Sequence, residues 1–160
     1  MTNIGVIGGA GYVGLVTGLG LAALGHKVIS MDVDIRRLDL LRNGKSAVYE
    51  QGLEPLLREL NEREQITYTE SQAEVARCSD VLFVAVGTPA SSDGAADLSA
   101  VIAIAEELRD QLNKYTVIVV KSTVPVGTLS KITAILSKTQ VKARISTWYR
   151  IRSFCVKVAV

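Results

Sequence analysis

The stretch NIGVIGGAGYVG, residues 3–14, decides the fold. It begins as a short apolar run rich in β-branched residues and continues directly into a turn rich in glycine. The run LVTGLGLAALGH, residues 15–26, follows and has the length of a helix that ends near Gly25. The stretch therefore predicts a β-strand, a glycine-rich turn and an α-helix in direct succession.

The same alternation of strands and helices continues along the chain. We expect further strands at 26–32, 66–69, 80–86 and 116–122, and helices at 35–44, 52–63, 71–78, 98–112 and 126–138. Such alternation is typical of right-handed crossovers that build a parallel sheet with helices on both faces. The sequence predicts an α/β protein with one domain over residues 1–145, a Rossmann-type doubly wound parallel sheet in three layers.

The spacing of the glycines indicates a bound phosphate. In Gly9-Ala10-Gly11-Tyr12-Val13-Gly14 the first glycine permits the tight turn out of the strand, and the second lets a pyrophosphate approach the backbone. The third lets the helix pack closely on the sheet. The N–H groups and the positive dipole end of that helix then hold the phosphate.

Asp32 ends the next predicted strand, 23 residues after Gly9. A carboxylate at this place accepts a hydrogen bond from the 2′-hydroxyl of an adenosine ribose and repels a 2′-phosphate, which favours NAD over NADP. Two alternatives stay open. Asp32 can simply start a turn with Asp34, and the cations Arg36 and Arg37 beside it can accommodate NADP.

Two polar loops follow strands that end at the same edge of the predicted sheet. They are VGTPASSDG, residues 86–94, and KSTVPVGT, residues 121–128, and they contain Thr88 and Thr123. Open α/β sheets bind ligands at the carboxyl ends of their strands, so both threonines are candidates for a ligand site. The alternative is that both loops are ordinary turns fixed by their prolines.

Composition excludes several other classes of protein. The 160 residues carry 13 Lys and Arg against 16 Asp and Glu up to residue 141, which leaves no basic surface for nucleic acid outside the end of the chain. The two cysteines are too few for a disulfide framework or a metal site and fit a reducing compartment. The uncharged run 4–25 could be a membrane span or a signal, but its many glycines and the absence of a basic flank argue against both.

Five motifs in one order resemble the N-terminal half of the UDP-glucose/GDP-mannose 6-dehydrogenases. They are GAGYVG (9–14), MDVD (31–34), NGKSAVYEQGLEPLL (43–57), VAVGTPASSDGAADLSAV (84–101) and KSTVPVGT (121–128). The resemblance runs from Met1 to about Ile145, and the last motif is most similar to the UDP-glucose branch. It departs from the family at Arg37, where a lysine is usual, and at Ala47 and Gln51, where prolines are usual.

The resemblance implies a set of residues around NAD and no metal. Val13 is expected at the pyrophosphate, Asp32 at the ribose, Arg37 near the adenosine, and Thr123 close to the reacting centre. The full cofactor-binding set that it implies is Gly9, Gly11, Tyr12, Val13, Gly14, Asp32, Arg37, Thr88 and Thr123.

The resemblance also implies a reaction, the oxidation of a sugar-nucleotide alcohol to a carboxylate by two hydride transfers to NAD, with the aldehyde held on a cysteine. The family places that cysteine and the nucleotide-sugar site in a later region, so we expect this chain to be inactive alone and Cys78 to be a core residue. The full-length enzyme is expected to be a cytoplasmic homodimer that binds neither nucleic acid nor membrane. Another Rossmann enzyme and a non-catalytic nucleotide-binding module remain alternatives.

The segment STWYRIRSFCVKVAV, residues 146–160, differs from everything before it. The resemblance implies a sixth strand and a loop of the form FDVVSNPEFLREGS here, and a coding sequence for that loop, read one base later, encodes STWYRIRSFCVKVA. We therefore expect 146–160 to be a frameshift-derived tail, with the final strand lost or replaced by residues 147–151 paired to the strand at 116–122. The alternative is a natural basic tail that binds an acidic partner.

Overall fold

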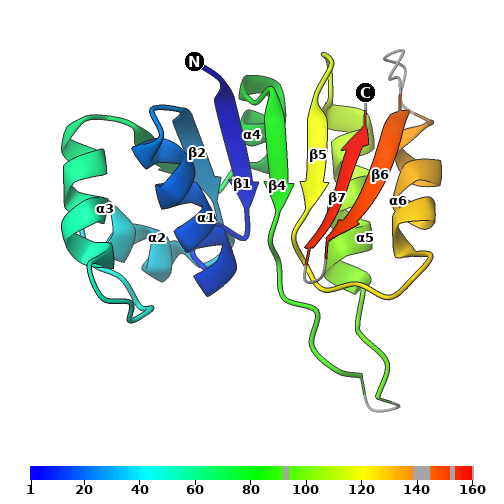
Figure 1. The fold of residues 1–160 in the computed structure, drawn as a ribbon, viewed down its shortest axis with the longest axis horizontal. Coiled ribbons are helices and arrows are strands. Elements are labelled where there is room, and N and C mark those ends of the chain that lie inside the picture. The colour runs from blue at the N-terminus through cyan, green and yellow to red at the C-terminus, as the bar shows by residue number, and fades with distance from the viewer. Residues whose placement is uncertain (92–93, 139–144, 152–153, 160) are drawn as a thin grey trace.

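A computed structural model of the chain describes residues 1–91, 94–138, 145–151 and 154–159. Its main sheet has five parallel strands in the order β3-β2-β1-β4-β5 (Figure 1). The strands are β1 (Asn3–Ile7), β2 (Lys27–Met31), β3 (Ile66–Thr69), β4 (Val81–Val84) and β5 (Val117–Val120). This order confirms the predicted doubly wound sheet.

Helices cover both faces of the sheet and make the three predicted layers. One face packs against α1 (Tyr12–Ala23), α2 (Ile35–Arg42) and α3 (Leu53–Glu62). The other packs against α4 (Gln72–Cys78), α5 (Ser99–Gln111) and α6 (Thr128–Leu136). Alternate residues of β1 point to the two faces of the sheet. Ile4 and Val6 pack with the helices α1, α2 and α3, and Ile7 packs with α4, α5 and α6.

The carboxyl ends of four strands lie level with one another. Ile7 is paired in register with Met31 of β2 and Val84 of β4, and Val84 is paired with Val120 of β5. The loops that follow these strands therefore start at one edge of the sheet, which is where parallel α/β sheets bind ligands.

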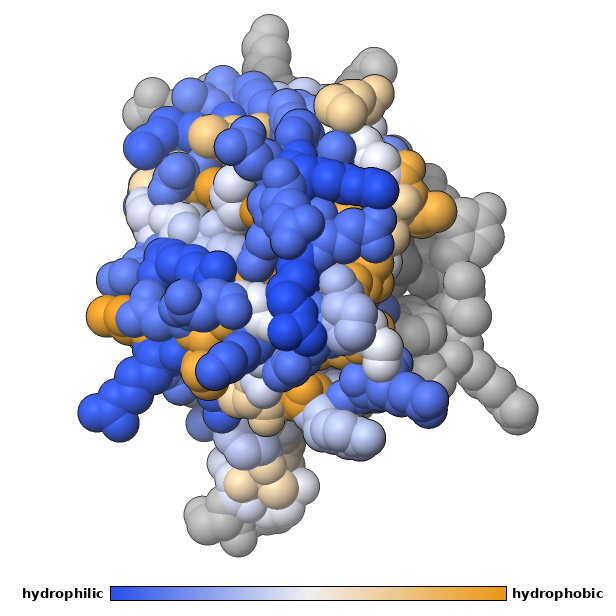
Figure 2. All heavy atoms as spheres, turned by 90° about the vertical axis from the view of Figure 1, so that its left-hand side faces the viewer, coloured by the Kyte–Doolittle hydropathy of each residue, from blue (hydrophilic) through white to orange (hydrophobic). Residues whose placement is uncertain are grey.

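The outer face of α3 is charged and solvent-exposed. Arg58 pairs with Glu54 at 3.7 Å and Arg63 with Glu59 at 2.8 Å, each one helical turn apart. Figure 2 shows that this side of the molecule is largely hydrophilic. The amphipathic pattern of α3 thus places its leucines on the sheet and its mixed charges in water.

Three helices end in the same hydrogen-bonded motif, and one of them does so with an unfavourable residue. After α1 and α2 the left-handed position is held by Gly25 and Gly44, whereas after α3 it is held by Glu64 at φ 52°. The next N–H, that of Gln65, donates to Leu60 O at 2.9 Å, as the motif requires. A residue with a Cβ is strained in this conformation.

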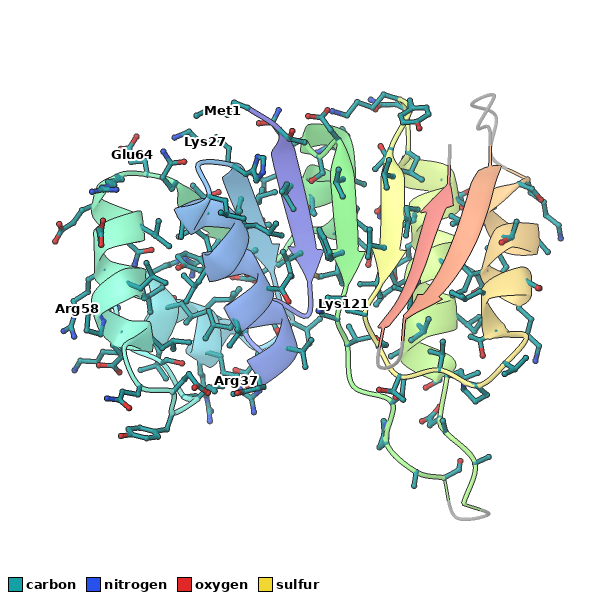
Figure 3. The ribbon with its side chains drawn as sticks, in the orientation of Figure 1. Met1, Lys27, Arg37, Arg58, Glu64 and Lys121 are labelled. Carbon is teal, nitrogen blue, oxygen red and sulfur yellow. The ribbon has the colours of Figure 1, made fainter. Side chains whose placement is uncertain are left out.

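Replacing Glu64 with Gly should raise the free energy of unfolding by about 0.5–1 kcal/mol, because it removes that strain at a small cost in unfolded-state entropy. Lys27 Nζ donates a hydrogen bond to Glu64 O at 2.8 Å, and both residues are labelled in Figure 3. This bond involves only the backbone of residue 64, so the variant keeps it. Urea unfolding measures the change. Glu64→Ala is the control: an equal gain in that variant would show that the side chain, and not the backbone, was responsible.

Cys78 is exposed at the end of α4, so its predicted place in the core was wrong. The buried side chains of this helix are those of Gln72, Val75 and Ala76, and the next buried position is Ser79. Cys78 falls outside this buried face of the helix and is exposed to water.

The end of the chain forms a separate two-stranded antiparallel sheet. β6 (Ile145–Ile151) pairs with β7 (Phe154–Ala159), and β7 lies next to β5 in the direction opposite to it (Figure 1). The prediction that residues 147–151 pair with β5 was therefore wrong. Only two residues separate the new strands, so a local hairpin closes at lower entropic cost than pairing with a distant edge.

Candidate functional site

The glycine-rich turn bends at Gly8. This residue has φ 81°, and its N–H and that of Gly9 both donate to Met31 O at 2.9 Å. A side chain at Gly8 would also lie 2.8 Å from Ala85 O of the neighbouring loop. The tight turn predicted at Gly9 therefore lies one residue earlier, at Gly8. Glycine is needed at position 9 for another reason, because a Cβ there would collide with Ser30 Oγ on β2.

Helix α1 begins inside the motif, at Tyr12, three residues earlier than expected. Gly11 is its N-cap and its C=O accepts the N–H of Leu15 at 2.8 Å. Among the described residues the N–H groups of Tyr12, Val13 and Gly14 have no acceptor, and no acidic side chain lies in the first turn. Three free donors and the positive end of the helix dipole make this turn a site for an anion.

Gly14 sets how closely α1 approaches the turn. A Cβ at this position would collide with Gly8 O and would stand 2.9 Å from both Gly8 C and Gly9 Cα. All three are backbone atoms and cannot rotate away. The first turn of α1 is thus held directly on the glycine-rich turn by the absence of a side chain at Gly14, as the spacing predicts.

Asp32 lies just beyond β2 and is half-buried. Its Oδ2 accepts the N–H of Ala10 at 2.9 Å and its Oδ1 accepts the N–H of Asp34 at 3.1 Å. The turn with Asp34 that the sequence offered as an alternative is therefore present. It does not exhaust the carboxylate, because each oxygen can accept a further hydrogen bond.

A cleft of about 490 Å³ opens beside Asp32 at the carboxyl edge of the sheet. Its lining combines the turn after β1, the end of β2, the loop after β4 and one side of α5. The residues are Ile7, Gly8, Gly11, Met31, Asp32, Val33, Arg37, Gln72, Ala85, Val86, Gly87, Ala100, Ala103, Ile104 and Glu107. The cleft brings together three of the predicted residues, namely Gly11, Asp32 and Arg37.

The sequence did not predict that Gly8, Gln72 and one side of α5 line the cleft. The small residues Ala100 and Ala103 stand one turn apart and leave room beside the sheet, which was the only signal that could have pointed to this wall. Nothing in the sequence shows that Gln72 is buried, since that depends on the packing of α5 over α4.

Arg37 lies at the cleft but is occupied by a neighbour. Its Nε is 3.2 Å from Asp34 Oδ2, and its backbone N–H donates to the other oxygen of Asp34 as the N-cap bond of α2. Figure 3 shows Arg37 at the same end of the sheet as Lys121. The guanidinium thus faces a carboxylate, which weakens its attraction for a ribose 2′-phosphate.

Thr88 and Thr123 join the two polar loops to each other. Thr88 Oγ1 donates to Thr123 O at 2.8 Å, and Ser122 Oγ donates to Val86 O at 2.6 Å. Neither threonine lines the cleft. Burial lowers the pKa of the neighbouring Lys121. The two hydrogen bonds therefore join the loops 86–91 and 121–127 into one unit, the paired loops, which contains both threonines.

Tyr12 and Val13 also lie outside the cleft, on the exposed start of α1. Tyr12 Oη donates to Glu50 Oε2 at 2.7 Å, and this hydrogen bond raises the pKa of Tyr12. The contact fastens the loop that precedes α3 to the start of α1.

Over the residues that the structure describes, no group of three or more His, Cys, Asp or Glu side chains could hold a metal ion. None of the helices in this part of the chain has the length and apolar character needed to cross a membrane. The uncharged run at 4–25 forms β1 and the 12-residue helix α1.

The glycine-rich turn, the Asp32 carboxylate and the cleft suit a dinucleotide, and comparison with known proteins agrees. Residues 2–156 match the UDP-glucose/GDP-mannose dehydrogenase family, NAD binding domain. UDP-glucose 6-dehydrogenase of Pseudomonas aeruginosa is 46% identical over 128 residues, which are 80% of this chain and 28% of that protein. UDP-glucose 6-dehydrogenase TuaD of Bacillus subtilis is 44% identical over 138 residues, 86% of this chain and 30% of that protein.

Solved structures agree with these relatives. A UDP-glucose dehydrogenase from Pyrobaculum islandicum superposes with a TM-score of 0.82 and 34% identity over 96% of this chain and 38% of that chain. A ternary complex of GDP-mannose dehydrogenase from Pseudomonas aeruginosa superposes with a TM-score of 0.81 and 30% identity over 92% of this chain and 36% of that chain. The chain thus spans about a third of the length of its relatives, and it belongs to the UDP-glucose/GDP-mannose dehydrogenase family, of which it contains the NAD-binding domain.

Proposed function

We propose that this domain binds NAD along the carboxyl edge of its sheet, with the adenosine ribose at Asp32 and the pyrophosphate at the start of α1. The observation that carries the proposal is the placement of the Asp32 carboxylate. The N–H of Ala10, within the glycine-rich turn, holds Oδ2 at 2.9 Å and so fixes the carboxylate beside the free N–H groups of α1. A ribose diol and a pyrophosphate need these two kinds of group side by side.

Each further residue has a role that follows from its position. Gly11 leaves the backbone of the turn bare for the pyrophosphate, and Tyr12 and Val13 supply N–H donors to it. Gly9 and Gly14 let the turn pack against β2 and α1 pack against the turn, which holds these donors in place. Arg37 stands near the adenosine. The paired loops that contain Thr88 and Thr123 are the proposed site for the nicotinamide end of NAD, with Thr123 close to the reacting centre.

The proposed parent reaction is the oxidation of UDP-glucose to UDP-glucuronate. NAD, when bound, supplies the hydride acceptor for this chemistry. Four relatives named UDP-glucose 6-dehydrogenase are 40–46% identical to the chain, against 38% for two named GDP-mannose 6-dehydrogenase, which favours UDP-glucose; one named putative UDP-glucose 6-dehydrogenase is also 38% identical. We also propose, on the resemblance alone, that the full-length enzyme is a cytoplasmic homodimer.

A calorimetric titration of the 160-residue chain tests the cofactor. NAD should bind, and NADP should bind at least tenfold more weakly, because the Asp32 carboxylate repels a 2′-phosphate and the Arg37 guanidinium that could attract it already faces Asp34. Tighter binding of NADP than of NAD would contradict the role proposed for Asp32.

A second prediction concerns turnover. The 160-residue chain by itself should form no NADH from UDP-glucose, because it matches the NAD-binding domain of the family, and a nucleotide sugar that is not positioned against NAD loses an effect of about 7–11 kcal/mol. An absorbance assay measures NADH, with the Pseudomonas aeruginosa enzyme as the positive control. Steady NADH formation above a control without protein, in a preparation free of longer enzyme, would refute the prediction.

We propose in addition that residues 146–160 come from a shifted reading frame, with the domain boundary at 145. The support is the match between STWYRIRSFCVKVA and the shifted translation of the family loop. The family match itself runs to residue 156, so the boundary needs an independent test. Sequencing the encoding DNA provides it, and a gene in which no shifted frame encodes SNPEFLREG would contradict the proposal.

A further inference from the structure

A buried polar side chain, that of Gln72, lines the cleft. It is the first residue of α4, directly after the turn that follows β3, and only 8% of it is exposed. Buried amides are normally fully hydrogen-bonded, because an unsatisfied polar atom costs free energy. A buried glutamine that lines a cleft is therefore a candidate for ligand recognition.

One half of the Gln72 amide is used by the protein. Its Nε2 donates to Ile104 O of α5 at 3.2 Å, and this bond fixes which way the amide points. Its Oε1 accepts no hydrogen bond from the described residues, yet it is not sealed from solvent as the Oε1 atoms of Gln65 and Gln111 are. Because Gln72 lines the cleft, this oxygen is an acceptor open to whatever occupies the cleft.

The walls around this acceptor suit a flat, largely apolar group. Ala100, Ala103 and Ile104 of α5 form one side, and Met31 and Val33 at the end of β2 form another. Val33 is 84% exposed, so it has apolar surface to bury when the cleft is filled. Small side chains on one wall and an open valine on the other leave a slot for an aromatic ring.

We propose that Gln72 recognises the adenine base, by accepting a hydrogen bond from its exocyclic amino group at Oε1. This inference rests on the proposed binding of NAD, and it names the base-reading residue, which the glycine-rich turn and Asp32 do not supply. Adenine offers a donor at this position, whereas hypoxanthine offers a carbonyl oxygen. To suit hypoxanthine the amide must rotate, and it then loses the bond to Ile104 O.

Glu107 is a second acceptor of the same cleft, one turn along α5 from Ala103. It is exposed, so water competes for its carboxylate, and its side chain is free to move. Gln72 is buried and held by a hydrogen bond, so it loses little freedom when it binds the base. The discrimination should therefore depend on Gln72 and not on Glu107.

Calorimetric titration with NAD and with nicotinamide hypoxanthine dinucleotide tests the inference on the unmodified chain and on Gln72→Met. The unmodified chain should bind NAD about tenfold more tightly than the hypoxanthine analogue. Gln72→Met should lose about that factor for NAD and change little for the analogue, so the two affinities converge. The control Gln65→Met makes the same change at the other end of β3, outside the cleft lining, and should leave both affinities unchanged.

Several results would overturn the inference. Equal binding of NAD and the analogue by the unmodified chain would do so without any variant. An equal loss for both ligands in Gln72→Met would show a structural role only, and a loss of discrimination in Glu107→Gln would assign the base to that residue instead. No binding of either dinucleotide to the folded, unmodified chain would defeat the proposed NAD site as well.

Discussion

Replacing Gly14 with Ala should lower the free energy of unfolding by about 3 kcal/mol and weaken NAD binding at least tenfold. The three atoms nearest to the added methyl group would be backbone atoms of Gly8 and Gly9, so α1 has to move away from the turn as a whole. That movement misaligns the N–H groups proposed to hold the pyrophosphate, and charge-assisted hydrogen bonds are worth roughly 1.5–3 kcal/mol each. Urea unfolding and calorimetric titration measure the two effects.

Gly20 of the same helix provides a matched control. It is exposed, and a Cβ there would meet no atom within 4 Å. Gly20→Ala should therefore raise stability by about 0.5–1 kcal/mol, the helix-propensity difference, and leave NAD binding unchanged. A Gly14→Ala protein as stable as the unmodified chain would contradict the close contact between α1 and the turn.

Replacing Asp32 with Ala should weaken NAD binding by about 1–3 kcal/mol, because the ribose hydroxyl loses its acceptor. The same change leaves the N–H of the buried residue Ala10 without its 2.9 Å partner, so stability should fall as well, by about 1–2 kcal/mol. The two effects are separated by titrating NAD and NADP into each protein at a temperature where it is fully folded.

Asp32→Asn is the companion variant, since it keeps the size of the side chain and removes its charge. Without the charge, repulsion of a 2′-phosphate falls, so the affinity for NADP should rise relative to that for NAD. Should Asp32→Ala weaken NAD and NADP by the same factor, the carboxylate would only support the turn and would not select the cofactor.

Local patterns were enough to predict the doubly wound parallel sheet and the position of Asp32 at the end of its second strand. Strand and helix periodicity depends on neighbours in sequence, and the right-handed crossover rule then leaves few arrangements. The turn glycine was placed one residue too late, because the demand for glycine at Gly8 comes partly from Ala85 in a loop far along the chain. The burial of Gln72 likewise depends on α5, which no local pattern reveals.

The end of the chain shows a different limit of sequence reasoning. Residues 147–151 are β-prone, and the strand prediction there was confirmed. The predicted pairing of this strand with β5 was wrong, because β7 begins only two residues after β6 ends and is a closer partner. Which strands pair is decided by loop length and competing edges, and propensity alone does not contain this information.

The central claim is that NAD lies across the glycine-rich turn and Asp32, and an amide NMR titration of the unmodified chain tests it most directly. Addition of NAD should shift the amide signals of residues 8–14, 32–33 and 85–88, and leave those at the amino edge of the sheet, such as Lys27 and Gln65, in place. Shifts confined to other parts of the chain, or no shifts at saturating NAD in a folded sample, would contradict the account.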